Sequence, residues 1–228
     1  MTVKVYYWPF KGRVATIRAL LKFLNVEHEI IDVDRAAWPA QKQAFIDGGF
    51  HFPNLPMIED GDFKLSESKA ILYYLAEKYG DGTILGKTAE DRAVVRQILG
   101  ITEDIGLAVG KALFDQDYKG TLQKTLAEDS KLPGKVERLE AFLGDQDFLL
   151  GYFTVADLAL AGVSLMAYHV YTSAELQSPF RRTSFYNHGN RVGQLPGIKE
   201  LYEDETFRNQ PIMPIPWLKI HEIVAPEN

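Results

Sequence analysis

The chain has 228 residues, of which 46% are hydrophobic and 25% charged, and its formal net charge is −6. This length gives ample core for one or two domains, and an acidic balance without a basic run argues against nucleic acid or anionic membrane as a partner. The sequence contains no cysteine, which excludes disulfides, thiolate metal sites and a cysteine nucleophile.

The first eighty residues alternate between strand and helix patterns. The expected elements are a strand over residues 3–7, a helix over 14–24, a strand over 29–33, a short helix over 38–45, two hairpin strands around 60–61, and a helix from 67–68 to 80. This β-α-β-α-β-β-α order resembles a thioredoxin-like domain. We therefore expect an α/β domain over residues 1–80 and a glycine-containing linker over 81–87.

Residues 88–228 contain no convincing strand and are expected to form an all-α domain. Helical spacing of apolar residues marks segments near 94–105, 136–143, 155–166 and 198–202. Thr154 with Asp157 three positions later predicts a capping box at the start of the third segment. The proline-rich end from Gln210 is expected to be extended.

Residues 3–7 enter a strand pattern at once, without a signal-type stretch, and no apolar run approaches about 18 residues. Cytoplasm is therefore the default expectation, with no membrane segment.

Leu55 lies between Asn54 and Pro56, where a cis peptide bond can turn its backbone N–H and C=O outward. These groups would then pair with an extended peptide, as a sheet edge does. A helix beginning near Ser68 would offer unpaired N–H groups to a carboxylate. The alternative is a proline at a strand entry and an ordinary helix cap.

Tyr7 ends the first expected strand, where α/β sheets meet their ligands. Its hydroxyl can stabilise a thiolate or oxyanion, and the Arg13 cation would favour negative charge nearby. Trp38 and Lys42, four residues apart, suit a terminal carboxylate. Each of these residues also has a purely structural interpretation. Tyr7 would be a half-buried strand residue and Arg13 a solvated one, and Trp38 would lie in the core beside a surface Lys42.

Taken together, residues 7–13, Trp38 with Lys42, residues 54–56, Glu67-Ser68 and the Thr154–Asp157 box resemble a cytosolic glutathione transferase over essentially the whole chain. The resemblance implies a thioredoxin-like glutathione site, a helical domain carrying most of the electrophile pocket, and a homodimer. The N-terminal motif and residues 52–56 are similar to the mu class. Arg13 and the short stretch before Trp38 are closer to sigma. We therefore describe the resemblance as mu/sigma-like.

The resemblance also implies a role for each matching residue. Tyr7 would donate to the glutathione sulfur with electrostatic support from Arg13, and Phe52 would insert into the partner subunit. The implied glutathione-binding residues are Trp8, Trp38, Lys42, Asn54, Leu55, Pro56, Glu67, Ser68 and Asp104. Asp104 would reach across from the second subunit. If the match to the family is shifted by one position, this residue is Glu103 instead.

The expected electrophile pocket rests on apolar positions that also suit a helical core. Its residues would be Phe10, Gly106, Val109, Gly110, Phe114, Tyr168 and His169. The expected activity is a glutathione S-transferase that attacks hydrophobic electrophiles with the glutathione thiolate, as in detoxification, with glutathione as co-substrate and no metal. The alternatives are a sigma-type glutathione-dependent isomerase and a non-catalytic binding or structural relative.

Overall fold

The computed structural model describes residues 2–127 and 129–226. Contacts divide the chain into two compact units. The first runs to Thr83 and includes Leu195–Gln210, and the second contains Ile84–Gln194 and the described residues after Gln210. The segment Leu195–Gln210 thus groups with the N-terminal unit, whereas the sequence placed it in a domain over 88–228. The boundaries of the functional domains stay a prediction.

The first unit has the element order expected from the sequence, followed by two short helices from later in the chain. Its elements are β1 (Val3–Tyr7), α1 (Val14–Phe23), β2 (His28–Asp32), α2 (Trp38–Asp47), β3 (Met57–Asp60), β4 (Phe63–Ser66), α3 (Ser68–Tyr79), α9 (Ile198–Glu203) and α10 (Glu205–Asn209).

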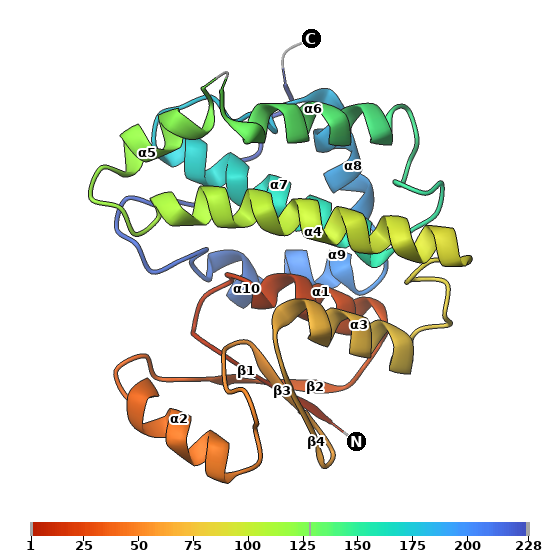
Figure 1. Ribbon diagram of the computed structural model, residues 1–228, viewed down its shortest axis with the longest axis vertical. Coiled ribbons are helices and arrows are strands. Elements are labelled where there is room, and N and C mark those ends of the chain that lie inside the picture. The colour runs from red at the N-terminus through yellow and green to blue at the C-terminus, as the bar shows by residue number, and fades with distance from the viewer. Residues whose placement is uncertain (1, 128, 227–228) are drawn as a thin grey trace. The chain divides into compact units, whose positions relative to one another are not determined.

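The strands form one sheet in the order β2-β1-β3-β4. β1 is parallel to β2, whereas β3 is antiparallel to both β1 and β4. Helices α1 and α3 lie on one side of this sheet and α2 on the other (Figure 1). Alternate residues of β1 and the inner face of α1 are fully or nearly fully buried, as expected where one face of a strand packs in the core. The thioredoxin-like fold is confirmed.

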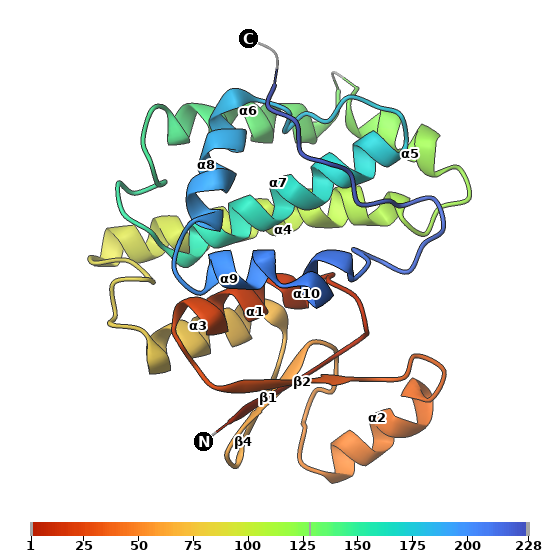
Figure 2. The same ribbon diagram turned by 180° about the vertical axis from the view of Figure 1, so that it is seen from behind.

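α9 packs against α1 (Figure 2). Gly197, which precedes α9, has φ +77°, and a Cβ at this position would lie 2.2 Å from the carbonyl oxygen of Lys22. Only glycine tolerates both the left-handed backbone and this approach. The contact brings a segment from late in the chain onto the N-terminal unit.

The second unit is helical. Its elements are α4 (Ala89–Ala112), α5 (Tyr118–Thr125), α6 (Lys131–Leu143), α7 (Val155–Ser173) and α8 (Thr183–Gly193). α4 and α7 each begin with a capping box, from Thr88 and Thr154 respectively. The box at Thr154 is confirmed. Helices α5, α8 and α10 are additions to the expected set.

α7 is long and apolar enough, by length and composition alone, to cross a membrane. The mean hydropathy of its most apolar window is 1.2, and 56% of that window is buried within the protein. This burial is what a core helix shows. A cytoplasmic location stays a prediction.

Candidate functional site

The register of the sheet brings three segments to one edge. Tyr6, next to the end of β1, pairs with Met57, the first residue of β3, and Met57 pairs with Ser66, the last residue of β4. Whatever precedes β3 and follows β4 therefore lies near the end of β1. These neighbours are the Leu55-Pro56 pair and the start of α3, two of the segments singled out from the sequence.

The peptide bond between Leu55 and Pro56 is cis, as expected. Within the described residues, no protein group pairs with the backbone N–H or C=O of Leu55. Asn54, just before it, donates from Nδ2 to Glu67 Oε1 at 3.2 Å. This bond connects the β3 entry loop to the start of α3 and leaves the Leu55 backbone available to an extended ligand.

Tyr7 is the best-defined polar group at this edge. The backbone N–H of Arg13 donates to the Tyr7 hydroxyl oxygen at 3.1 Å. Since the phenol oxygen accepts this bond, its own proton remains to be donated. Among the described residues, no protein acceptor takes that proton.

Burial raises the pKa of Tyr7, and the hydrogen bond and positive charge of Arg13 only partly offset this effect. The side chain exposes 5% of its surface. Phe10, also buried, packs edge-on against the Tyr7 ring with centroids 5.4 Å apart. Tyr7 is therefore a protonated phenol near neutral pH, and it can act as a hydrogen-bond donor.

Gly12 permits this arrangement, although it is not among the site residues expected from the sequence. Its φ is +34°, and a Cβ here would lie 2.5 Å from the Tyr7 hydroxyl oxygen. The loop between β1 and α1 can therefore fold over Tyr7 only without a side chain at this position. The signal in the sequence was a glycine five residues after the strand-ending tyrosine.

Trp8 and Trp38 meet at the same edge, with their rings edge-to-face at 5.5 Å. Trp38 is half-buried at the start of α2, and Lys42 is exposed one turn later. α2 has no fully buried residue. Aromatic contacts hold α2 against the sheet instead: Phe45 of α2 packs against Tyr6 of β1 and against Trp38.

Glu67 holds an unusual backbone conformation before α3, with φ +72° and ψ +112°. For a residue with a Cβ this region costs about 1–3 kcal/mol, and such residues concentrate at ligand sites. Ser68 is the first residue of α3, where backbone N–H groups point out of the helix. The two residues thus offer a carboxylate and an anion-binding helix start side by side.

The remaining expected site residues belong to the second unit. The Asp104 carboxylate on α4 accepts a short hydrogen bond from Lys135 on α6. Along α4, Val109 is fully buried, Gly106 and Gly110 are half-buried, and Phe114, just past its end, is 67% exposed. The assignment of these residues to a site stays a prediction.

The tail after Gln210 runs along α7, where Tyr168 and His169 lie. Tyr168 donates from its hydroxyl to the Glu222 carbonyl at 2.9 Å, and the His221 N–H donates to His169 Nδ1 at 3.1 Å. One turn later, Ser173 Oγ lies 2.8 Å from His221 Nε2. These contacts cover the expected pocket positions on α7 with the tail.

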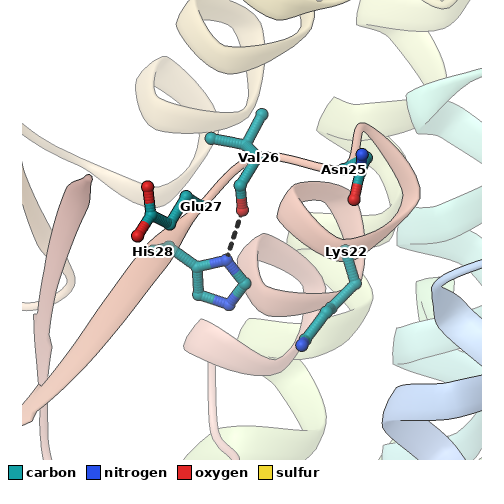
Figure 3. A pocket seen from close by; sticks show the side chains of 5 residues that line it. All are labelled: Lys22, Asn25, Val26, Glu27 and His28. Atoms are coloured by element: carbon teal, nitrogen blue, oxygen red, sulfur yellow. Dashed lines mark hydrogen bonds between the residues drawn. The ribbon is translucent and has the colours of Figure 1, made fainter. Parts of the chain in front are cut away.

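A separate hollow of about 330 Å³ lies where α1 connects to β2 (Figure 3). Its lining residues are Lys22, Asn25, Val26, Glu27 and His28. His28 pairs with Val3 at the beginning of the parallel strands, whereas Tyr7 lies at their end. The hollow is therefore distinct from the site around Tyr7. Among the described residues, no three His, Cys, Asp or Glu side chains are grouped to hold a metal.

Comparisons with known proteins identify relatives of this chain over the N-terminal unit and over nearly its whole length. A model of the glutathione S-transferase N-terminal domain matches residues 1–77. Glutathione S-transferase class-mu 26 kDa isozyme 7 of Fasciola hepatica is 29% identical, with 93% of each chain covered. A class-mu 26 kDa isozyme of Schistosoma mansoni is 33% identical over 66% of this chain and 74% of its own. The crystal structure of the glutathione S-transferase Blo t 8 has a TM-score of 0.77 at 27% identity and covers 96% of this chain and 100% of its own.

Proposed function

This chain belongs to the glutathione S-transferase family and is a glutathione transferase of mu-like character, and we propose that Tyr7 activates the glutathione thiol in its N-terminal unit. The observation that carries this proposal is the hydrogen bond from the Arg13 N–H to the Tyr7 oxygen. It fixes the phenol and leaves its proton for a sulfur acceptor. The Arg13 cation adds a favourable field for a thiolate.

The free energy needed to lower the pKa of the glutathione thiol matches what one hydrogen-bond donor such as Tyr7 supplies. A free thiol has a pKa of about 8.5, and lowering it by two units needs about 2.7 kcal/mol. A hydrogen bond to a charged group contributes about 1.5–3 kcal/mol. The thiolate then attacks an electrophilic carbon, a carbon–sulfur bond forms, and the leaving group departs with its electron pair.

The other groups at the sheet edge suit the rest of the tripeptide. The outward Leu55 backbone pairs with the cysteinyl unit, and Glu67 and Ser68 hold the α-amino and α-carboxylate groups of the γ-glutamyl end. Trp8 supports Trp38, which with Lys42 binds the glycyl carboxylate. Each partner is complementary in charge or hydrogen bonding to the group it receives.

A homodimer is part of the proposal. Phe52 exposes 80% of its surface next to the site, an unusual position for a large apolar side chain. An aromatic that inserts into a second subunit accounts for this exposure. Asp104, or Glu103 beside it, would then contact the glutathione that is bound to the second subunit. Sedimentation of the wild type and of Phe52→Ser tests this assembly.

Turnover of an aromatic halide with glutathione, followed by absorbance, tests the transferase proposal. We expect turnover that needs both substrates, together with retention of the protein on immobilised glutathione. Retention without conjugation of any electrophile would favour the isomerase or binding alternatives. Loss of retention as well would contradict the glutathione site.

A further inference from the structure

The loop between β1 and α1, residues 8–13, carries the N–H group that binds Tyr7. The loop has no regular secondary structure, and Gly12 within it takes a positive φ. α1 also begins at this point without a side-chain cap. The direction of the Arg13 N–H therefore depends on contacts that hold the loop from outside.

Lys11 joins this loop to α10, which lies near the other end of the chain. Its Nζ donates to the Arg208 carbonyl at 3.0 Å and lies 5.2 Å from the centroid of the Phe207 ring. The carbonyl belongs to the last turn of α10, where carbonyl groups lack partners within the helix. The ammonium satisfies one of them and brings its positive charge to a helix C-terminus, which favours cations. Figure 2 shows α10 beside the start of α1.

The α10 side of this contact is itself well fixed. Phe207 exposes 5% of its surface. Its N–H donates to Asp204 Oδ1 at 2.7 Å, and its ring stacks on that of Tyr202 with centroids 5.8 Å apart. Lys11 therefore connects an irregular loop to an ordered part of the same unit.

Arg18 provides a comparison within the same cluster. Its Cζ lies 4.7 Å from the centroid of the Phe207 ring, and its Nη1 donates to Gln210 Oε1 at 2.8 Å. Arg18 thus makes the same two kinds of contact with α10 and the residue that follows it. It lies within α1, however, where the helix already fixes its backbone. Of these two cations, only Lys11 belongs to the loop.

We propose that Lys11 is a positioning residue for thiol activation, because it holds the loop of residues 8–13 against α10 and so keeps the Arg13 N–H directed at Tyr7. This role of Lys11 rests on the proposed function of Tyr7. Without the Lys11 contacts the loop takes up further conformations, and the Tyr7 oxygen loses its donor for part of the time. The phenol is then held less firmly under the sulfur, so the pKa of the bound thiol rises.

The charge of Lys11 is part of this arrangement. A cation is attracted to the face of an aromatic ring, and an ammonium donates a stronger hydrogen bond than a neutral amine. Burial and the charge of Arg18 lower the pKa of Lys11 to about 8, so the ammonium form still predominates at neutral pH. Lys11→Arg keeps both the charge and a donor, whereas Lys11→Met keeps only an apolar chain.

The experiment compares the full-length wild type with Lys11→Met, Lys11→Arg and Arg18→Met. Ultraviolet titration of bound glutathione gives the thiol pKa, and urea unfolding gives the stability of each protein. In Lys11→Met we expect the thiol pKa to rise by about one unit, so kcat near about pH 6.5 should fall roughly fivefold while KM for glutathione changes little. Lys11→Arg should restore the wild-type values. Arg18→Met should lose similar stability and keep the wild-type thiol pKa.

Hydrogen exchange in the absence of glutathione gives a second readout, which reports on the loop alone. The peptide that spans residues 8–14 should exchange faster in Lys11→Met than in the wild type, in Lys11→Arg or in Arg18→Met. If Lys11→Met does not fold, Lys11→Gln takes its place. Glutamine keeps a donor for the Arg208 carbonyl but not the charge, so the same changes should appear with smaller size.

An unchanged thiol pKa in Lys11→Met, beside a lowered one in the wild type, would overturn the role of Lys11 and leave that of Tyr7 intact. Equal rises in Lys11→Met and Arg18→Met would also overturn it, because a general loss of stability would then explain both. A wild type that binds glutathione without lowering its thiol pKa would contradict the proposed function of Tyr7 itself, and with it this role of Lys11.

Discussion

The backbone N–H of Arg13 donates a hydrogen bond to the hydroxyl oxygen of Tyr7, six residues earlier in the chain, at 3.1 Å. The bond orients the phenol from the loop that follows β1. Because the donor is a main-chain group, the loop conformation controls the orientation of Tyr7. The first prediction concerns that loop.

Gly12→Ala should reduce turnover by tenfold or more, about 1.4 kcal/mol in the transition state. The new Cβ would lie 2.5 Å from the Tyr7 oxygen, and φ +34° is unfavourable for alanine. Gly134→Ala is the matched control, since a Cβ at this position in α6 has no neighbour within 4 Å. Steady-state kinetics on both variants check the prediction. Equal activity of the two would remove the role assigned to the loop.

Glu67→Gln should raise the KM for glutathione about tenfold and leave kcat nearly unchanged. The substitution keeps the shape and the hydrogen bond with Asn54 but removes the charge that would bind the α-amino group. A hydrogen bond to a charged group contributes about 1.5–3 kcal/mol, against about 0.5–1.5 for a neutral one. Glu77→Gln, an exposed site later on α3, should leave KM unchanged. An unaltered KM in Glu67→Gln would show that this carboxylate does not bind glutathione.

Asp157→Ala should lower the free energy of unfolding of the helical unit by about 3–5 kcal/mol. Asp157 is fully buried and accepts from the N–H groups of Leu149 and Thr154, both at 2.8 Å. Its Oδ1 also lies 3.0 Å from Nε2 of the buried His188. Thr88→Ala removes an exposed cap and should cost only about 1 kcal/mol. Urea unfolding compares the two, and similar costs would contradict the structural role of Asp157.

Asp60→Asn should destabilise the N-terminal unit near neutral pH, by about 1–3 kcal/mol. Burial raises the pKa of Asp60, but hydrogen bonds from Lys78, Tyr79 and Tyr74 outweigh this effect and hold the pKa below its ordinary value. A depressed carboxyl pKa stabilises the fold above the unfolded-state value of about 3.9 and loses that effect as the pH falls.

The cost of Asp60→Asn should therefore shrink below about pH 4. Unfolding of the wild type and the variant at a series of pH values measures the difference. A cost that stays constant down to the acid transition would show that the charge of Asp60 does not carry the effect.

β1 and α1 follow from the sequence, because β1 has a two-residue alternation of buried positions and α1 has apolar residues at helical spacing. α8 was not predicted, because its buried positions are Phe185, His188 and Val192, and a histidine interrupts the apolar spacing. α5 has one buried residue, Leu122, and gives almost no pattern. Grouping of Leu195–Gln210 with the first unit depends on contacts between distant segments, which periodicity does not report.

Some features of the candidate site could likewise be predicted from the sequence, and others required the structure. Tyr7 and the cis bond before Pro56 could be predicted because they occupy recognisable places beside strands. The donor to Tyr7 is a backbone N–H, which every residue except proline has, so its identity required the structure. The cluster of Lys11 and Arg18 on Phe207 joins residues nearly two hundred positions apart and leaves no local signal.

The most direct test of the central claim is the ultraviolet titration of the thiolate in glutathione bound to the wild type, to Tyr7→Phe and to Tyr6→Phe. Tyr6 is the control, because its hydroxyl donates to Glu59 at 2.9 Å. We expect bound glutathione to titrate about two pH units below the free thiol value of about 8.5 in the wild type and in Tyr6→Phe. In Tyr7→Phe it should titrate near the free value. A Tyr7→Phe titration that matches the wild type would contradict thiol activation by Tyr7.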